Sequence, residues 1–204
     1  LDNLVVIHNG LDPATVAPSR DRETVRRHYG FADHEPVVCM MGNLRKWKGQ
    51  ETVIQALAAV RPHFPDVRLL LVGETSVADA DYESRLKGLA AELGLTHHVV
   101  FTGYQSNVAD LVVASDVVVH ASLAPEPFGR VILDAMACHR PVIASRAGAI
   151  PEIVVENETG LTFPPGDAAA LAVQLRRVLD DREFADRLAR QGHTRLIEHF
   201  HVRQ

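Results

Sequence analysis

The sequence has few cysteines and no metal-type spacing of cysteine and histidine. Only two of its 204 residues are cysteine, Cys39 in an apolar strand-like run and Cys138 near the end of a helix-like run. The 11 histidines include no HExxH motif and no paired Cys/His spacing. We therefore expect two buried free thiols and no bound metal.

Long hydrophobic runs and a secretory leader are also lacking. No apolar run approaches the roughly 18 residues needed to cross a bilayer. The first residues, LDNLVVIHNG, lack the cationic stretch of a signal peptide. We expect a cytoplasmic protein whose membrane association, if any, is peripheral to the inner face. Because the chain starts at Leu1 and stops within a helical pattern, we also expect a piece of a longer protein.

An excess of positive charge is absent as well. The chain has 21 Lys and Arg against 26 Asp and Glu, a formal net charge of -5. This balance excludes a nucleic-acid partner held by a broad basic face, but it permits a small anionic ligand held by a local basic cluster. With 47% hydrophobic and 23% charged residues, the composition is that of a folded globular domain.

Short apolar runs alternate with longer helical patterns from Val37 onward. This alternation is typical of repeated βα units and predicts an α/β fold with a parallel sheet. The expected strands are 37–42, 67–73, 99–102, 116–120, 141–145 and 160–163. The expected helices are 51–60, 82–93, 106–114, 129–138, 168–179 and 183–197.

The first 27 residues differ from the rest. Residues 4–7 are one more strand candidate, and a polar, proline-containing stretch from 12 to about 27 follows them. We predict that residues 1–27 are an interdomain segment and that residues 28–204 form the domain. Ligands of parallel sheets bind beyond the carboxyl ends of the strands, so the loops that leave those ends are expected to carry the chemistry.

The loop after the first expected strand, GNLRKWKG, brings Arg45, Lys46 and Lys48 to one strand end before a helix that starts near Gly49. These cations and the helix amino terminus favour phosphate, so the loop is either an anion clamp or a solvated basic surface. It is neither a Walker loop nor a GxGxxG turn. No nucleophile elbow or Ser-His-Asp order supports covalent hydrolysis.

The segment APEPFGRVILDAMA precedes and forms another helix. Glu126 lies just before the helix start, where the backbone amides of Phe128, Gly129 and Arg130 are expected to point outward unpaired. Glu126 and Asp134 could bracket an oxygen-rich ligand there. Alternatively, Glu126 only favours the helix dipole and Asp134 pairs with Arg130 at helical spacing. A third segment, SRAGAIPEIV, either touches the ligand or is a tight connection.

Taken together, these motifs resemble glycosyltransferase family 4 (glycosyl transferases group 1), specifically its C-terminal, donor-binding domain of the GT-B fold. VIHNGLD resembles the family's interdomain segment, GNLRKWKG its GRLxxxKG loop, and PEPFGRVILDAMA its Glu-x7-Glu signature. FTGYQSNVADLVVASDVVVHAS and CHRPVIASRAGAIPEIVVENETGLTFPPGD resemble the neighbouring patterns. The resemblance spans nearly the whole chain and implies a Rossmann-like sheet with helices on both faces.

The resemblance implies roles for individual residues. Lys48 would bind the donor diphosphate and stabilise charge on the leaving nucleotide, and Glu126 would face the hydroxyls of the transferred sugar. The family's usual arginine is Asn43 here, so either Arg45 or Arg130 compensates, or diphosphate binding is weaker.

The ribose and base sites are implied in the same way. The family's second glutamate, which grips the ribose, is Asp134 here, one methylene shorter. Gly103 and Tyr104 would border the base. Gly148 and Ala149 occupy a family Gly-Gly turn, where Ala149 fits only if its φ is not positive. The full set of implied donor-binding residues is Gly42, Asn43, Arg45, Lys48, Gly103, Tyr104, Glu126, Phe128, Gly129, Arg130, Val131 and Asp134.

By this resemblance the chain is expected to be the donor half of a retaining, metal-independent hexosyltransferase. Its substrate would be a nucleotide-diphosphate sugar such as a UDP- or GDP-sugar, with no cofactor. The acceptor, which is a glycan, a lipid or a small molecule, would bind an N-terminal domain of the same enzyme. That domain is absent here, so this piece alone is expected to be inactive. The alternatives are a non-catalytic nucleotide-sugar-binding module and a fragment of a nucleotide-sugar epimerase.

Overall fold

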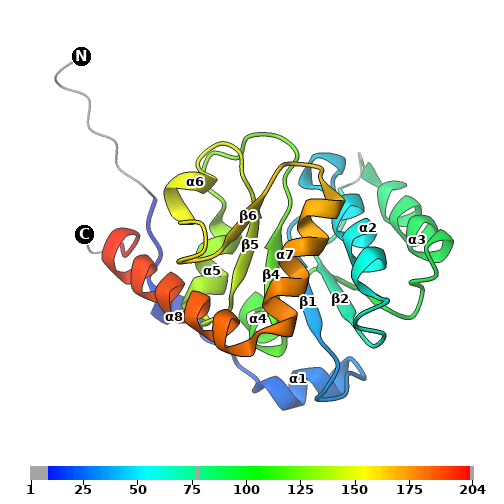
Figure 1. Cartoon of the computed structure of the whole chain (residues 1–204), viewed down its shortest axis with the longest axis horizontal. Helices are drawn as coiled ribbons and strands as arrows, with labels where there is room; N and C mark the ends of the chain where they lie inside the picture. The colour runs from blue at the N-terminus through cyan, green and yellow to red at the C-terminus, as the bar shows by residue number, and fades with distance from the viewer. Residues whose placement is uncertain (1–8, 77–78, 203–204) are drawn as a thin grey trace.

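Six apolar runs form one parallel sheet in the computed structural model, which describes residues 9–76 and 79–202 (Figure 1). The strands are β1 (Val37–Met41), β2 (Arg68–Val72), β3 (Val99–Gly103), β4 (Val117–His120), β5 (Val142–Ser145) and β6 (Leu161–Phe163). All neighbours pair in parallel, in the order β3-β2-β1-β4-β5-β6. The predicted α/β parallel sheet is confirmed. The strand candidate at residues 4–7 lies outside the described residues.

Helices connect the strands where the sequence periodicity predicts them. The longer ones are α2 (Gln50–Val60), α3 (Tyr82–Glu92), α4 (Val108–Ala114), α5 (Arg130–Ala137), α7 (Ala168–Asp180) and α8 (Arg182–His199). The elements that the patterns did not delimit are η1 (Pro13–Thr15), α1 (Arg22–His28), η2 (Lys46–Lys48) and α6 (Ile150–Ile153).

The strands bury both of their faces. Along β1, Val38 and Met40 pack into a core with α2, α3 and α7, whereas Val37, Cys39 and Met41 pack into a second core with α4, α5 and α6. Helix α8 crosses the edge of the sheet (Figure 1). Its first half packs into the first core, and its last residues pack into the second core. Burial of both faces explains why the strands are continuous apolar runs.

Both cysteines are free thiols, but only one is fully buried. Cys39 lies in the second core, and burial raises the pKa of its thiol to about 12. Cys138, expected to be buried, is only partly buried at the C-cap of α5. Burial still raises the pKa of the Cys138 thiol to about 11.

The stretch predicted as an interdomain connection is laid along the domain between residues 9 and 28. Its helix α1 packs against α4. The carboxylate of Asp110 in α4 accepts hydrogen bonds from the backbone amides of Ser19 and Arg20, at 2.6 and 3.0 Å, and from both of their side chains. Arg26 is 1% exposed and donates to backbone carbonyl groups. The side chains of Ser19 and Arg20 are therefore held by a carboxylate about 90 positions along the chain, whereas Arg26 is held by backbone carbonyl groups and its buried Nε has no hydrogen-bond partner among the described residues.

Replacing Asp110 with asparagine is expected to lower the free energy of unfolding at neutral pH by about 1–3 kcal/mol, because an amide cannot accept all four hydrogen bonds. Burial acts to raise the pKa of Asp110, but the bonds from Arg20 and Ser19 outweigh it and lower the pKa. The stabilisation is therefore complete above the unfolded-state pKa of about 3.9 and is lost as pH falls through the lower folded-state pKa.

Urea unfolding between pH 7 and pH 3 measures this contribution, and the asparagine variant should lose less stability over the acid range than the wild type. Exposed Asp180, at the end of α7, is the matched control, and its asparagine variant should change stability by less than about 0.5 kcal/mol. Equal stability of the wild type and the Asp110 variant at pH 7 would contradict the prediction.

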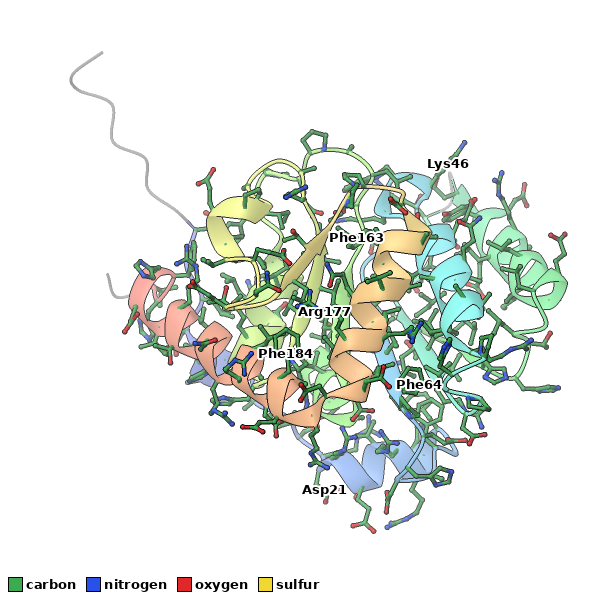
Figure 2. The ribbon with its side chains drawn as sticks, viewed as in Figure 1. Asp21, Lys46, Phe64, Phe163, Arg177 and Phe184 are labelled. Atoms are coloured by element: carbon green, nitrogen blue, oxygen red, sulfur yellow. The ribbon has the colours of Figure 1, made fainter. Side chains whose placement is uncertain are left out.

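The strand order reverses direction between β1 and β4. From β1 the chain adds β2 and β3 on one side, and from β4 it adds β5 and β6 on the other. In open parallel sheets such a reversal leaves a crevice beyond the carboxyl ends of the two central strands. The loops over this crevice follow β1 and β4. Figure 2 shows Lys46, on the loop after β1, at the opposite end of the molecule from Asp21.

Candidate functional site

The loop after β1 is pressed against the loop after β4. Gly49 has a φ of 80°, and a Cβ atom at that position would lie 2.1 Å from the carbonyl oxygen of Ala121. The backbone amide of Leu123 donates to the carbonyl oxygen of Trp47 at 2.7 Å. Only glycine allows this approach. The packing carries Lys48, at the end of η2, across the crevice to the β4 side.

Lys48 and Glu126 form an ion pair in this crevice. The Lys48 Nζ atom lies 2.6 Å from Glu126 Oε1, and the side chains are 19% and 14% exposed. The ammonium group also lies 4.2 Å from the centroid of the Trp47 ring. The structure thus brings together the two residues to which the family resemblance assigns the donor diphosphate and the transferred sugar.

Two further residues hold Glu126, and the sequence analysis did not identify either. His120, the last residue of β4, places Nε2 2.5 Å from Glu126 Oε2. Ser122 donates from Oγ to the same oxygen at 2.5 Å. Both side chains are buried, His120 to 4% exposure. A histidine at the carboxyl end of a central strand was the available signal.

The surroundings of Glu126 keep its carboxyl group ionised. Burial acts to raise the pKa of Glu126, but hydrogen bonds from His120, Lys48 and Ser122 outweigh it and lower the pKa to about 2. At neutral pH the group is therefore a carboxylate that only accepts hydrogen bonds.

The third loop, after β5, supports the backbone of Glu126. Ala149 donates from its amide to the carbonyl oxygen of Glu126 at 3.1 Å. Gly148 has a φ of 61°, and a Cβ atom there would lie 2.4 Å from the same oxygen. Ala149 has a φ of -76°, so alanine fits where the family usually has glycine. This turn is therefore a tight connection that also fixes Glu126.

Helix α5 begins beside Glu126 without a side-chain cap. Gly129 occupies the N-cap with a φ of 80°, and no side chain bonds to the first amides. A Cβ atom on Gly129 would lie 2.8 Å from the side chain of Ile150. Phe128 packs partly into the second core. No side chain caps the amides at this helix start, which is where the sequence analysis expects an oxygen-rich ligand.

Asp134 lies on the next turns of α5 and pairs with Arg130, whose Nε is 2.9 Å from Oδ1. This ion pair is the one that the sequence analysis gave as an alternative for Asp134, a contact with Arg130 at helical spacing. Burial raises the pKa of Asp134, and Arg130 opposes that effect. Asp134 also lines a cavity of about 200 Å³ next to the crevice. The other lining residues are Met41, Gly42, Asn43, Val72, Gly73, Tyr104, Gln105, Val108 and Val131.

The two cations considered as substitutes for the family's arginine at position 43 are both paired. Arg45 Nε lies 3.4 Å from Oδ2 of Asp79, a residue between β2 and α3. Arg130 is engaged with Asp134. Among the described residues, no group of three or more His, Cys, Asp or Glu side chains is arranged to hold a metal ion.

The sequence pattern of the family described as glycosyl transferases group 1 matches residues 21–195. The chain belongs to this family. Over 198 residues this group 1 glycosyltransferase domain is 32% identical to N-acetyl-alpha-D-glucosaminyl L-malate synthase of Bacillus anthracis, covering 97% of this chain and 50% of that protein.

Solved structures agree with the family assignment. The group 1 domain superposes on Anabaena HepE in complex with UDP and glucose with a TM-score of 0.91 and 34% identity, covering 97% of this chain and 53% of that one. For the C-terminal domain of a group 1 protein, LpcC of Francisella tularensis, the TM-score is 0.81 and the identity 27%, with 95% and 100% covered. The predicted resemblance to the GT-B glycosyltransferases and their Rossmann-like sheet is confirmed.

The group 1 domain spans about half the length of the full relatives that it matches, 50% of the B. anthracis protein and 53% of HepE. Across residues 9–76 and 79–202, no helix has the length and apolar character needed to cross a membrane.

Proposed function

We propose that this chain is the donor-binding domain of a retaining, metal-independent glycosyltransferase that transfers a hexosyl group from a nucleotide-diphosphate sugar to an acceptor. The observation that carries the proposal is the Lys48–Glu126 pair, 2.6 Å apart, at the reversal point of the sheet. A basic group for diphosphate and an acidic group for sugar hydroxyls meet there, next to the uncapped start of α5.

Each part of the donor has a candidate contact. Lys48 and the amides of Gly129, Arg130 and Val131 at the start of α5 receive the diphosphate oxygens. Lys48 also stabilises the charge that grows on the leaving nucleoside diphosphate, in place of a metal ion. Glu126 accepts hydrogen bonds from the sugar hydroxyls.

The cavity beside the crevice suits the nucleoside. Asp134 lies on its wall at the side of α5, where a ribose hydroxyl would reach it. Gly103 ends β3 and Tyr104 begins the loop after it, and Tyr104, 70% exposed on the wall of the cavity, offers a flat apolar surface to a base. The HepE structures support a UDP-sugar as the first donor to test, because one contains UDP and glucose and another contains UDP-glucose.

Calorimetric titration of the chain with UDP, GDP and ADP tests the donor site. We expect at least one of the three to bind, and to bind equally well after metal ions are removed with EDTA, because the site uses Lys48 and backbone amides. If a folded sample binds none of the three nucleoside diphosphates, this chain does not contain the proposed donor site.

The reaction itself requires the N-terminal acceptor domain. Joined to that domain, the protein should transfer hexose with the anomeric configuration of the donor retained, which NMR of the product reveals. Inversion at a ring carbon of the free nucleotide sugar would indicate an epimerase instead, and binding without turnover would indicate a non-catalytic module.

A further inference from the structure

His120 occupies an unusual place for a histidine. It ends the central strand β4 and shares the face of Val118, which α5 and the second core cover, so its ring is 4% exposed. A buried imidazole stays in such a place only if its nitrogen atoms are hydrogen-bonded. Nδ1 faces the Ser145 hydroxyl at 3.4 Å, and Nε2 faces Glu126 Oε2 at 2.5 Å.

The partner fixes which ring nitrogen carries a proton. Because the Glu126 carboxylate can only accept, Nε2 of His120 must donate the hydrogen bond. Ser122 donates to the same carboxylate oxygen, and its Oγ lies 3.2 Å from the His120 Nε2. The protein itself therefore supplies two donors to Oε2, both from the strand and loop that lead into Glu126.

The other oxygen is held differently. Oε1 is bonded to Lys48, which comes from the loop after β1. In the proposed function Lys48 turns to the donor diphosphate, and Oε1 then loses this partner. A hydroxyl of the donor sugar is the group that could replace it, because hydroxyl groups donate to carboxylates.

We propose that His120 is a positioning residue for the donor sugar: it holds Glu126 by Oε2 and thereby aims Oε1 at a sugar hydroxyl. The inference rests on the proposed function and assigns a role to a residue that touches no donor atom itself. Ser122 assists by occupying the same oxygen. A carboxylate released from His120 could rotate about its side-chain torsions, and its contact with the sugar would weaken although the diphosphate site stayed intact.

The test compares each nucleoside diphosphate with its sugar ester, using UDP and UDP-glucose, GDP and GDP-mannose, and ADP and ADP-glucose. For the pair that binds, we divide the dissociation constant of the nucleoside diphosphate by that of its sugar ester. This ratio measures how much the sugar contributes to binding. In His120→Phe this ratio should fall by about tenfold while the affinity for the nucleoside diphosphate stays unchanged. His120→Gln, whose amide nitrogen can reach the position of Nε2, should keep most of the ratio.

Two further variants guard against a mere loss of folding. Ser122→Ala removes the other hydrogen-bond donor to Oε2. Because serine is smaller than histidine, this change disturbs packing less, and it should also lower the ratio. His193→Phe alters another half-buried histidine, whose Nδ1 lies 3.1 Å from the Met136 carbonyl, and should leave the ratio unchanged.

An unchanged ratio in His120→Phe would overturn the positioning role and leave the donor site standing. A wild type that binds the nucleoside diphosphate with no added contribution from the sugar would overturn it too, as would an equal loss of affinity for both ligands. Failure of the wild type to bind any nucleoside diphosphate is a separate result that would remove the proposed function together with the inference.

Discussion

Replacing Lys48 with alanine is expected to weaken binding of the nucleoside diphosphate by about 1–3 kcal/mol, because the variant loses a charge-assisted hydrogen bond to a phosphate oxygen. In the complete enzyme the loss should be larger in the rate of transfer than in binding, since charge on the diphosphate grows as the sugar leaves. Calorimetry on this chain gives the first quantity, and steady-state kinetics on the complete protein give the second.

Lys46 is the matched control. It lies two residues away on the same η2 turn and is exposed. Figure 2 shows its side chain pointing outward from the top of the molecule. Lys46→Ala should keep the wild-type affinity. Equal affinities of Lys48→Ala and the wild type would make Lys48 a partner of Glu126 alone and exclude it from the donor site.

The single tryptophan offers an independent measurement of the same event. Trp47 is the chain's only tryptophan, and the Lys48 ammonium lies 4.2 Å from its ring centroid. Movement of Lys48 toward the diphosphate should change the indole fluorescence on titration. Lys48→Ala should abolish that change, because no cation then leaves the ring.

Gly148→Ala is expected to lower the free energy of unfolding by about 3 kcal/mol or more, the sum of a left-handed backbone conformation and a steric clash. Its φ is 61°, and the added Cβ atom would meet the Glu126 carbonyl oxygen at 2.4 Å and the Glu126 amide nitrogen at 2.7 Å. Relief of the clash requires the backbone of Glu126 to shift, so the contribution of the sugar to donor binding should fall as well.

Gly30→Ala isolates the backbone effect. Gly30 is exposed and has a φ of 70°, but a Cβ atom there meets nothing within 4 Å. This variant should cost only about 1–2 kcal/mol and leave ligand binding intact. Chemical denaturation of both variants gives the comparison. If Gly148→Ala and Gly30→Ala lower the free energy of unfolding equally, the close approach of Gly148 to Glu126 adds nothing to the cost of the substitution.

The sequence predicts the sheet well because the strands bury both faces and appear as unbroken apolar runs. It also places Lys48 and Glu126 at one edge of the parallel sheet, since both lie in loops that leave that edge, while their roles toward the donor stay predictions. It does not reveal that they touch, because the contact depends on how closely Gly49 lets one loop approach Ala121. The pairing of Arg45 with Asp79 depends on loop packing in the same way.

The sequence did not predict the contacts of two other polar features, because polarity alone does not show whether a side chain is buried. His120 ends an apolar strand, where a histidine has no distinctive periodicity, so its bond to Glu126 emerges only in three dimensions. The polar stretch at residues 12–27 has the composition of a connection. Within it, the side chains of Ser19 and Arg20 are matched by Asp110 in α4, about 90 positions along the chain, which no local pattern records.

The two cysteines have a practical consequence for labelling. Thiol reagents react with the thiolate, and burial holds the thiols of Cys39 and Cys138 in the protonated form at neutral pH. A cysteine introduced in place of exposed Lys46 would therefore alkylate much faster than either native one. A spectroscopic reporter could be attached beside the crevice of the natural protein with no cysteine removed first.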